Sequence, residues 1–124
     1  MRKTVSVALP GREYDVIIGP NLLAEAGALI APLLRRKRVA VITESRVAAL
    51  HLETLREGLA AAGIEMVSLE LPPGEGTKDW ANLQRCVGWL LDEQVERGDI
   101  VVAFGGGVIG DLVGFAAAVL RRGV

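Results

Sequence analysis

A strand, a glycine-rich turn and a helix follow one another near the end of this sequence, and this order constrains the fold more than any other feature. Residues 100–104 form an apolar run, residues 105–107 are three glycines, and residues 112–117 are again mostly apolar. Glycine lets a charged group approach the backbone without meeting a Cβ, and the first N–H groups of a helix lie unpaired at the positive end of its dipole. The segment therefore indicates a turn of an α/β fold that can bind nucleotide phosphates.

Three glycines of this segment, Gly105, Gly107 and Gly110, also match the spacing G-x-G-x-x-G of dinucleotide-binding folds. In those folds the glycines occupy the first turn of the sheet, and an acidic residue follows about 20 positions later. Here they come late, and the sequence stops at Val124. A glycine turn that only lets the helix pack closely on its strand explains the spacing about as well.

Hydrophobic periodicity divides the rest of the chain into strands and helices. Two alternating runs, residues 5–9 and 14–18, flank a Pro-Gly turn and predict an antiparallel hairpin at the edge of a sheet. A helical pattern over residues 22–34 follows, with Asn21 as its expected N-cap. The later patterns alternate between strand and helix, at residues 38–43, 52–63, 66–71, 80–91, 100–104 and 108–120.

This order predicts one α/β domain over residues 1–124. We expect a Rossmann-like, mainly parallel sheet with helices on both faces and an N-terminal antiparallel hairpin. The strand at 100–104 and the helix at 108–120 are expected to be buried. The last helical pattern ends in Arg121, Arg122 and Gly123, where a further strand would begin, so we expect the protein to continue beyond Val124.

Charge and composition exclude several classes of partner. The chain has 14 basic and 15 acidic side chains that are interspersed, so neither nucleic acid nor an anionic membrane is expected to bind. The most apolar stretch, residues 108–120, is too short to cross a bilayer and contains Asp111. Because Cys86 is the one cysteine and no cationic leader precedes the fold, we expect the protein in the reducing cytoplasm.

Polar residues follow three of the predicted strands, where parallel α/β sheets bind their ligands. The carboxylate of Glu44 can accept hydrogen bonds from ribose hydroxyls, or it can simply begin the next helix. After residues 72–74, Lys78 falls where the helix dipole disfavours a cation, so it reaches an anionic ligand, pairs with Glu75 or is solvated. Asp111 can cap the last helix or accept from a ligand hydroxyl.

Four other residues of reactive or aromatic type are expected to be structural. His51 has no cysteine or carboxylate at metal-ligand spacing, which favours a helix surface. Cys86 lies within a helical pattern without an activating histidine, which favours a packed thiol. Trp80 and Trp89 suit helix packing better than a nucleic-acid stacking platform, because no basic stripe accompanies them.

Two segments resemble a known family. Residues 73–78 resemble the P-x-G-E-x-x-K loop of the 3-dehydroquinate synthase family, and residues 105–117 with Arg122 and Gly123 resemble its glycine-rich segment. The resemblance covers essentially the whole chain, as the family's N-terminal NAD-binding domain. It implies a lyase of the shikimate pathway that converts 3-deoxy-D-arabino-heptulosonate 7-phosphate into 3-dehydroquinate and phosphate. In that reaction NAD is used catalytically: an alcohol is oxidised, phosphate is eliminated, the ketone is reduced back and the ring closes by aldol addition.

The resemblance also implies roles for individual residues. Glu75 and Lys78 would contact the nicotinamide half of NAD and its ribose, while Gly106, Gly107 and Asp111 would hold the diphosphate and ribose. Glu44 would lie near the adenosine ribose, beside Arg46, where some members have asparagine. Arg122 would reach the substrate phosphate of the neighbouring subunit, or it only complements a helix C-terminus. The implied cofactor-binding set is Glu44, Gly74, Glu75, Lys78, Gly106, Gly107, Val108, Ile109, Gly110 and Asp111.

The same resemblance places the family's divalent metal, zinc or cobalt held by a glutamate and two histidines, in a C-terminal domain that this sequence lacks. The chain alone is therefore expected to be inactive, and the full enzyme is expected to be a homodimer. Three alternatives stay open: a related sugar-phosphate cyclase, an iron-type polyol or alcohol dehydrogenase, and a stand-alone nucleotide-binding module. The P-x-G-E-x-x-K loop favours the synthase over the dehydrogenases.

Overall fold

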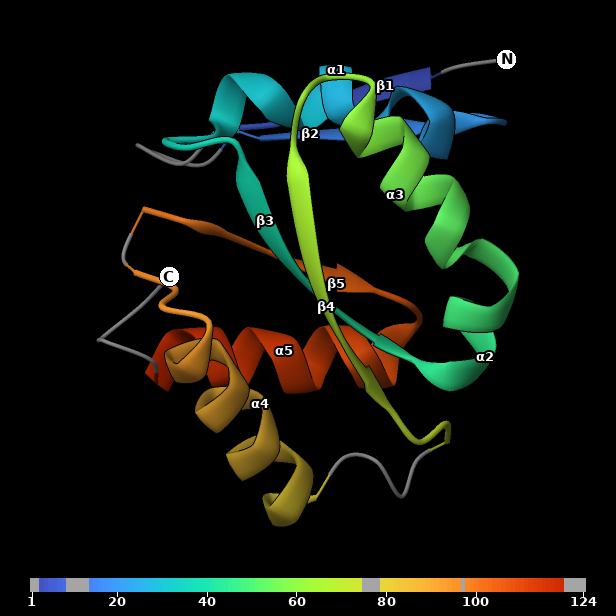
Figure 1. Cartoon of the computed structure of the whole chain (residues 1–124). Helices are drawn as coiled ribbons and strands as arrows, with labels where there is room; N and C mark the ends of the chain where they lie inside the picture. Colours follow the sequence, from blue (N-terminus) through green and yellow to red (C-terminus); the bar gives the residue numbers. More distant parts are fainter. Residues whose placement is uncertain (1–2, 9–13, 75–78, 97, 120–124) are drawn as a thin grey trace.

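The strands form a two-stranded and a three-stranded sheet in the computed structural model, which describes residues 3–8, 14–74, 79–96 and 98–119 (Figure 1). β1 (Lys3–Val7) and β2 (Tyr14–Ile18) pair antiparallel. β3 (Arg38–Glu44), β4 (Glu65–Leu71) and β5 (Ile100–Phe104) pair in parallel, in the spatial order β4-β3-β5. The predicted α/β fold with a mainly parallel sheet is confirmed.

The helices follow the strands as the periodicity predicts. α4 (Trp80–Asp92) and α5 (Gly107–Val119) are regular α-helices. The connection from β3 to β4 runs through α2 (Ser45–Val47), a π-helical segment η3 (Ala48–Leu52) and α3 (Glu53–Ala60). The connection from β2 to β3 consists of η1 (Leu22–Glu25), α1 (Ala26–Ile30) and η2 (Ala31–Leu33).

The start of this first helical stretch differs from the expectation. Asn21 has a left-handed backbone with φ 59°, and its side chain makes no capping hydrogen bond. Asparagine is one of the few residues that adopt this conformation readily. Asn21 therefore turns the chain out of β2 by its backbone conformation, and the predicted side-chain cap is wrong.

Helices cover both faces of the parallel sheet, and the side chains of β3 alternate between them. Val39 and Val41 are buried against α1 and α3. Ala40 and Ile42 point to the opposite face, where α4 and α5 complete the core. Figure 1 shows α1 and α3 above the sheet and α4 and α5 below it. The expected placement of helices on both faces is confirmed.

The two connections between the parallel strands run in opposite directions across the sheet. The first leads from β3 to β4 on one side, and α4 then leads back past β3 to β5 on the other side. In open α/β sheets such a reversal opens a crevice at the carboxyl ends of the strands, where ligands bind. The ends of β3 and β5 are therefore the place to look for a functional site.

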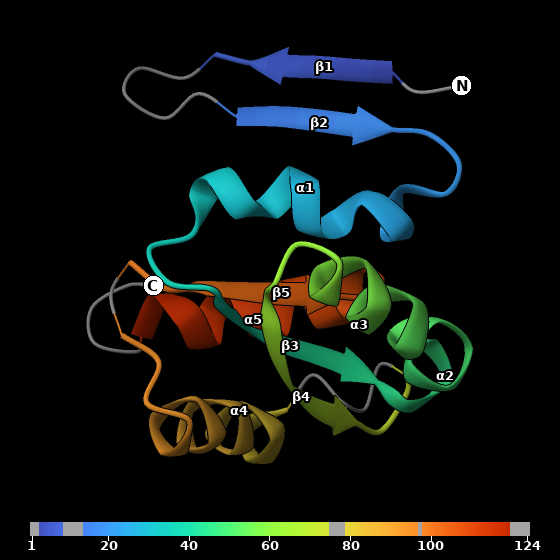
Figure 2. The same cartoon turned by 45° about the horizontal axis from the view of Figure 1, so that its top comes forward.

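The hairpin does not extend the parallel sheet, in contrast to the edge position expected for it. Figure 2 shows the stretch around α1 lying between the hairpin and the sheet. The chain enters this helical stretch directly after β2, so a helical layer separates the two sheets. Val5, Val16 and Ile18 on the hairpin consequently stay exposed.

β5 and α5 are less buried than expected. β5 pairs with β3 on one edge only within the described part of the chain, and none of its side chains is fully buried. α5 buries one face, but Phe115 and Val119 on its other side are 54% and 51% exposed. Trp80 on α4 is 69% exposed and does not pack in the core as expected, whereas Trp89 does.

Candidate functional site

The carboxyl ends of β3, β4 and β5 meet around one open cavity of about 210 Å³. The parallel register brings them to the same level, with Glu44 opposite Leu71 and Thr43 opposite Phe104. The structure thus brings together the three turns in which the sequence predicts ligand-binding residues. The cavity is lined by Glu44, Arg46, Pro72, Pro73, Gly74, Gly106, Gly107, Val108 and Ile109.

A buried hydroxyl holds β3 and β5 together at this end. Thr43 is fully buried, and its Oγ1 donates a hydrogen bond of 2.6 Å to the main-chain oxygen of Phe104. A buried hydroxyl needs such a partner, because an unsatisfied one costs free energy. The bond fixes the start of the glycine turn beside the end of β3.

Glu44 is the N-cap of α2. Its Oε1 accepts the N–H of Val47 at 2.8 Å, and its Oε2 accepts the N–H of Arg46 at 3.1 Å. The helix-starting role considered from the sequence is therefore present. Each carboxylate oxygen has a second lone pair, so the same half-buried carboxylate can still accept from a ligand in the cavity that it lines.

Among the three consecutive glycines, residues 105–107, the surrounding structure favours glycine at one position and not at the other two. A Cβ on Gly105 would lie 3.1 Å from Cγ1 of Ile109, so close packing favours glycine there. A Cβ on Gly106 or Gly107 would meet no atom within 4 Å, and neither residue has a positive φ. Within the described residues, neither packing nor backbone conformation requires glycine at 106 and 107, and both positions face the cavity.

The loop after β4 forms the opposite wall of the cavity. Gly74 has a φ of 99°, a conformation that favours glycine, and a Cβ there would also meet no atom within 4 Å. Pro72 and Pro73 precede it and have fixed φ angles. This wall is therefore stiff up to the point where the described segment ends.

The N-terminus of α5 opens into the cavity. α5 begins at Gly107, and the N–H of Gly110 donates to the main-chain oxygen of Gly106 at 3.0 Å. The N–H groups before Gly110 have no acceptor within the helix, and they lie at the positive end of its dipole. The residues carrying them line the cavity, so this wall suits an anionic ligand.

The strand that carries an acidic residue and the strand that carries the glycines are neighbours. In dinucleotide-binding folds the acidic residue for the ribose comes about 20 positions after the glycines. Here Glu44 ends β3 and the glycines follow β5, which pairs with β3, so the acidic residue lies upstream in sequence. The spatial arrangement is the one that those folds use, with the chain order reversed.

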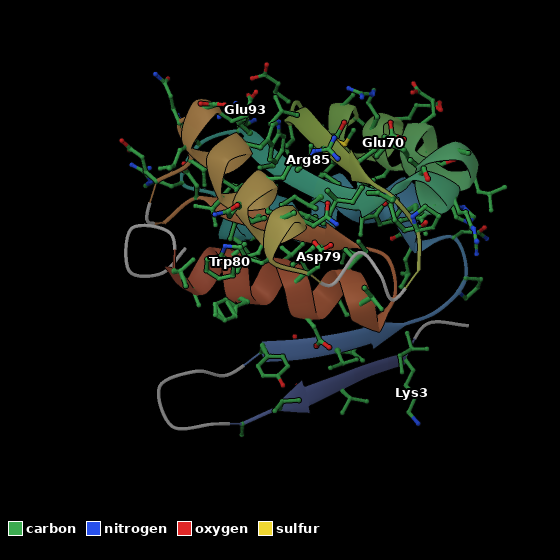
Figure 3. The ribbon with its side chains drawn as sticks, turned by 90° about the horizontal axis from the view of Figure 1, so that it is seen from below. Lys3, Glu70, Asp79, Trp80, Arg85 and Glu93 are labelled. Atoms are coloured by element: carbon green, nitrogen blue, oxygen red, sulfur yellow. The ribbon has the colours of Figure 1, made fainter. Side chains whose placement is uncertain are left out.

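Asp111 lies away from this cavity and is not the N-cap of α5. The helix begins four residues earlier, at Gly107, whereas an N-cap precedes the first helical residue. Asp111 lines a second cavity of about 240 Å³ together with Asp79 and Trp80. Figure 3 shows those two residues at the start of α4, beside α5. Gly110 is exposed and lines neither of these two cavities.

Three predicted site residues, Glu75, Lys78 and Arg122, lie outside the described residues. The predictions that Glu75 and Lys78 contact a cofactor and that Arg122 contacts a substrate phosphate therefore stay predictions. Asp79, directly after this segment, caps α4 by accepting the N–H of Asn82 at 2.8 Å. The start of the helix that follows the loop is thus firmly set.

Arg46 is the residue of the cavity wall to which sequence reasoning assigned no role. Its side chain is exposed and lines the cavity, two positions beyond the end of β3. The sequence does contain a signal for Arg46: a basic residue two positions after the acidic residue that ends a strand. Pro72 and Pro73, which precede Gly74, line the cavity as well.

The described residues that line this cavity include neither a histidine nor a cysteine. Within the part of the chain that the structure describes, no group of three or more His, Cys, Asp or Glu side chains is placed to hold a metal ion. His51 is exposed on η3. Burial raises the pKa of the Cys86 thiol to about 11, which Arg85 offsets only slightly, so this thiol is a packed core group. Among the described helices, none has the length and apolar character needed to cross a membrane.

Comparisons with known proteins agree on one family. Residues 68–124 match the family model described as 3-dehydroquinate synthase N-terminal. The chain is 72% identical over its whole length to the 3-dehydroquinate synthase of Ruegeria pomeroyi and 70% identical to that of Roseobacter denitrificans. In both comparisons it spans 34% of the relative, so the chain covers about a third of the length of the curated relatives it matches.

Two solved structures show the same fold. A 2-deoxy-scyllo-inosose synthase in complex with carbaglucose-6-phosphate, NAD⁺ and Co²⁺ matches 98% of this chain, and 33% of its own, with a TM-score of 0.82 and 19% identity. A 2-epi-5-epi-valiolone synthase from Streptomyces hygroscopicus with NAD⁺ and Zn²⁺ bound matches 94% of this chain, and 32% of its own, with a TM-score of 0.77 and 31% identity. Both are synthases by name.

Proposed function

We propose that this chain is the NAD-binding part of a 3-dehydroquinate synthase, as the counterpart of the N-terminal third of that enzyme, because residues 68–124 match the family model and the whole chain is 72% identical to one such synthase. The complete protein would convert 3-deoxy-D-arabino-heptulosonate 7-phosphate into 3-dehydroquinate and phosphate. Identities of 60–72% to relatives named for this activity support the synthase over a related cyclase, a dehydrogenase or a stand-alone module.

The observation that carries the proposal is the open space over Gly106 and Gly107. No described atom comes within 4 Å of a Cβ built at either position, and neither φ is positive, so the fold itself gives no reason for glycine. A ligand that touches the backbone supplies the reason. The cavity has the donors, the missing Cβ atoms and a nearby carboxylate that a dinucleotide needs.

The residues of the cavity would divide the dinucleotide between them. The N–H groups at the start of α5 would bind the diphosphate, and Glu44 would accept from the hydroxyls of the adenosine ribose. Pro72, Pro73 and Gly74 would close the opposite side and exclude water. When bound, NAD supplies the capacity to take a hydride from the substrate alcohol and to return it.

Asp111 and Gly110 need a different account from the one the resemblance implies. Asp111 lines the neighbouring cavity and has partners of its own, so any contact with NAD would come from the nicotinamide half reaching towards α4. We retain Asp111, Gly110, Glu75 and Lys78 as cofactor-binding candidates on the resemblance alone. Arg122 stays a candidate contact for a substrate phosphate on the same ground.

The metal, the remaining catalytic groups and the dimer contacts belong to the proposal for the complete protein. Among the described residues, no group of three or more His, Cys, Asp or Glu side chains is placed to hold zinc or cobalt. The 2-epi-5-epi-valiolone synthase with bound NAD⁺ and Zn²⁺, 31% identical to this chain, supports NAD with a divalent metal as the cofactor pair. The homodimer and the cytoplasmic location stay predictions.

A matched pair of glycine variants tests the proposal. In the full-length protein that contains this chain, Gly106→Ala adds a methyl group to the cavity and is expected to weaken NAD binding about tenfold or more in calorimetric titration. Gly114→Ala adds the same methyl group to the outer side of α5, where it also meets no atom within 4 Å, and should leave NAD affinity unchanged. Equal NAD affinity in both variants would exclude this cavity as the diphosphate site.

A further inference from the structure

The cavity wall carries a cation beside the carboxylate proposed to bind the ribose. Glu44 ends β3, and Arg46 follows two residues later in α2, so both side chains line the same cavity. In nucleotide-binding α/β folds, a carboxylate at this place selects a free ribose 2′-hydroxyl, whereas an arginine nearby accommodates a 2′-phosphate. This chain presents both groups.

Within the described part of the chain, the Arg46 guanidinium has no ionic partner. Arg35, Arg36, Arg38 and Arg56 each pair with a carboxylate at 3.8 Å or less. Among the described residues no ion pair or hydrogen bond involves the side chain of Arg46. A guanidinium has five N–H donors in a planar fork that matches a phosphate, so an unpaired one at a cavity wall is a suitable phosphate contact.

The carboxylate of Glu44, whose charge repels a phosphate, is held in place by the backbone at the start of α2. Each of its oxygens accepts a backbone N–H, from Val47 at 2.8 Å and from Arg46 at 3.1 Å. These charge-assisted bonds hold the carboxylate against the start of α2. A ligand with a 2′-phosphate therefore meets a hydrogen-bonded carboxylate and, beside it, the exposed Arg46 cation, whose positive charge opposes that of the carboxylate.

We propose that Arg46 determines how this site treats the ribose 2′ position, and that it allows the cavity to bind a 2′-phosphorylated dinucleotide of the NADP type as well as NAD. The inference rests on the proposed function, because it assumes that the adenosine ribose lies beside Glu44. Arg46 acts here as a specificity residue for the cofactor. It takes no part in proton or hydride transfer.

The test compares NAD with NADP by calorimetric titration of the full-length protein that contains this chain. The wild-type protein should bind NADP within about tenfold of its NAD affinity. Arg46→Gln should lower NADP affinity about tenfold or more, the value of a charge-assisted contact, and change NAD affinity less than about threefold. Arg46→Lys should retain part of the NADP affinity, because it keeps the charge but loses the planar fork.

A control variant and a fragment pair separate this effect from a change in net charge. Arg56→Gln removes the same charge from α3, outside the cavity, and should change neither affinity. The fragments 2′,5′-ADP and 5′-AMP, which lack the nicotinamide half, should show the same dependence on Arg46. Glu44→Gln should shift the preference towards NADP, because it removes the opposing charge.

Three outcomes would overturn the inference. If NAD binds and NADP does not, or if Arg46→Gln weakens both nucleotides equally, the assignment of Arg46 is wrong and the proposed function stands. If neither nucleotide binds, the proposed function fails, and the inference fails with it.

Discussion

At the scale of single residues, the buried carboxylate of Asp99 joins the start of β5 to the chain just before β3. It accepts hydrogen bonds from Arg36 at 2.6 and 3.2 Å, from Arg35 at 3.1 Å and from the N–H of Glu96 at 2.9 Å. Burial raises the pKa of Asp99, but the bonds from Arg36, Glu96 and Arg35 outweigh it and hold the pKa below its ordinary value of 3.8. The ionised carboxylate therefore stabilises the fold.

This cluster gives a pH-dependent prediction. Asp99→Asn should lower the free energy of unfolding at pH 7 by about 1–3 kcal/mol. We expect a loss near the lower end of this range, because both guanidinium groups are about half exposed and solvent screens their charges. The pKa of Asp99 in the folded protein lies below its ordinary value of 3.8. The stabilisation is therefore present above pH 3.8 and is lost as the pH falls from there through the lower, folded-state pKa. The deficit of the variant should therefore shrink in denaturant titrations at pH 3.

The matched control is Asp92→Asn, at the exposed end of α4, which should change stability by less than about 0.5 kcal/mol. A deficit of Asp99→Asn that is as large at pH 3 as at pH 7 would contradict the ionic role of Asp99.

Sequence reasoning identified part of the site at this scale. Glu44, Gly106 and Gly107 could be predicted because residue type and position after a strand carry the signal. The prediction that Asp111 caps α5 is wrong, because α5 begins four residues earlier, at Gly107. The run of glycines does not show at which residue the helix starts, so the sequence could not exclude Asp111 as a cap. The network around Asp99 joins residues more than 60 positions apart, and no local pattern indicates it.

At the scale of elements, two glycines allow the helical stretch after β2 to pack directly on α3. A Cβ on Gly58 would overlap the main-chain oxygen of Leu23, and a Cβ on Gly27 would overlap the main-chain oxygen of Gly58. Neither glycine has a positive φ, so close approach of the two backbones is the reason for both. This contact sets the distance between that helical stretch and α3.

Gly58→Ala should therefore destabilise the protein by about 1–3 kcal/mol, because backbone atoms cannot move aside as a side chain can. Gly88→Ala is the matched control in α4, where a Cβ meets no atom within 4 Å. It should stabilise by up to about 1 kcal/mol through helix propensity. Thermal unfolding of both variants checks this, and similar shifts of Tm in both would refute the close backbone contact.

Periodicity located the helices and strands, since the apolar residues of each described element repeat at its own period. It could not show that residues 22–33 form short 3₁₀ and α turns, because these share nearly the same spacing. It also overestimated the burial of α5. An apolar sequence shows that a face avoids water, but it does not show which part of the protein covers that face.

At the scale of the whole molecule, we propose that the chain forms one side of a larger site. The glycine turn after β5 and the acidic end of β3 line an open cavity, while Trp80, Phe115 and Val119 leave apolar surface exposed over α4 and α5. Exposed apolar surface of this kind is typical of an interaction site. The relatives are about three times as long as this chain, in agreement with a site that needs further chain.

The isolated chain should consequently show no synthase activity. Incubated with NAD and the heptulosonate phosphate, it should release no phosphate above the uncatalysed rate in a continuous phosphate assay, because it spans only 34% of the relative named for this activity. The full-length protein should release phosphate under the same conditions. Release by the 124-residue chain alone would show that the active site is complete without the remaining length.

The central claim is that the cavity at the carboxyl ends of β3, β4 and β5 binds the diphosphate of NAD, and a crystal structure of the full-length protein with NAD tests it most directly. The account predicts diphosphate oxygens within hydrogen-bond distance of the backbone N–H groups at the start of α5, and the adenosine ribose beside Glu44. A diphosphate bound elsewhere, with the space over Gly106 and Gly107 filled by water, would contradict it.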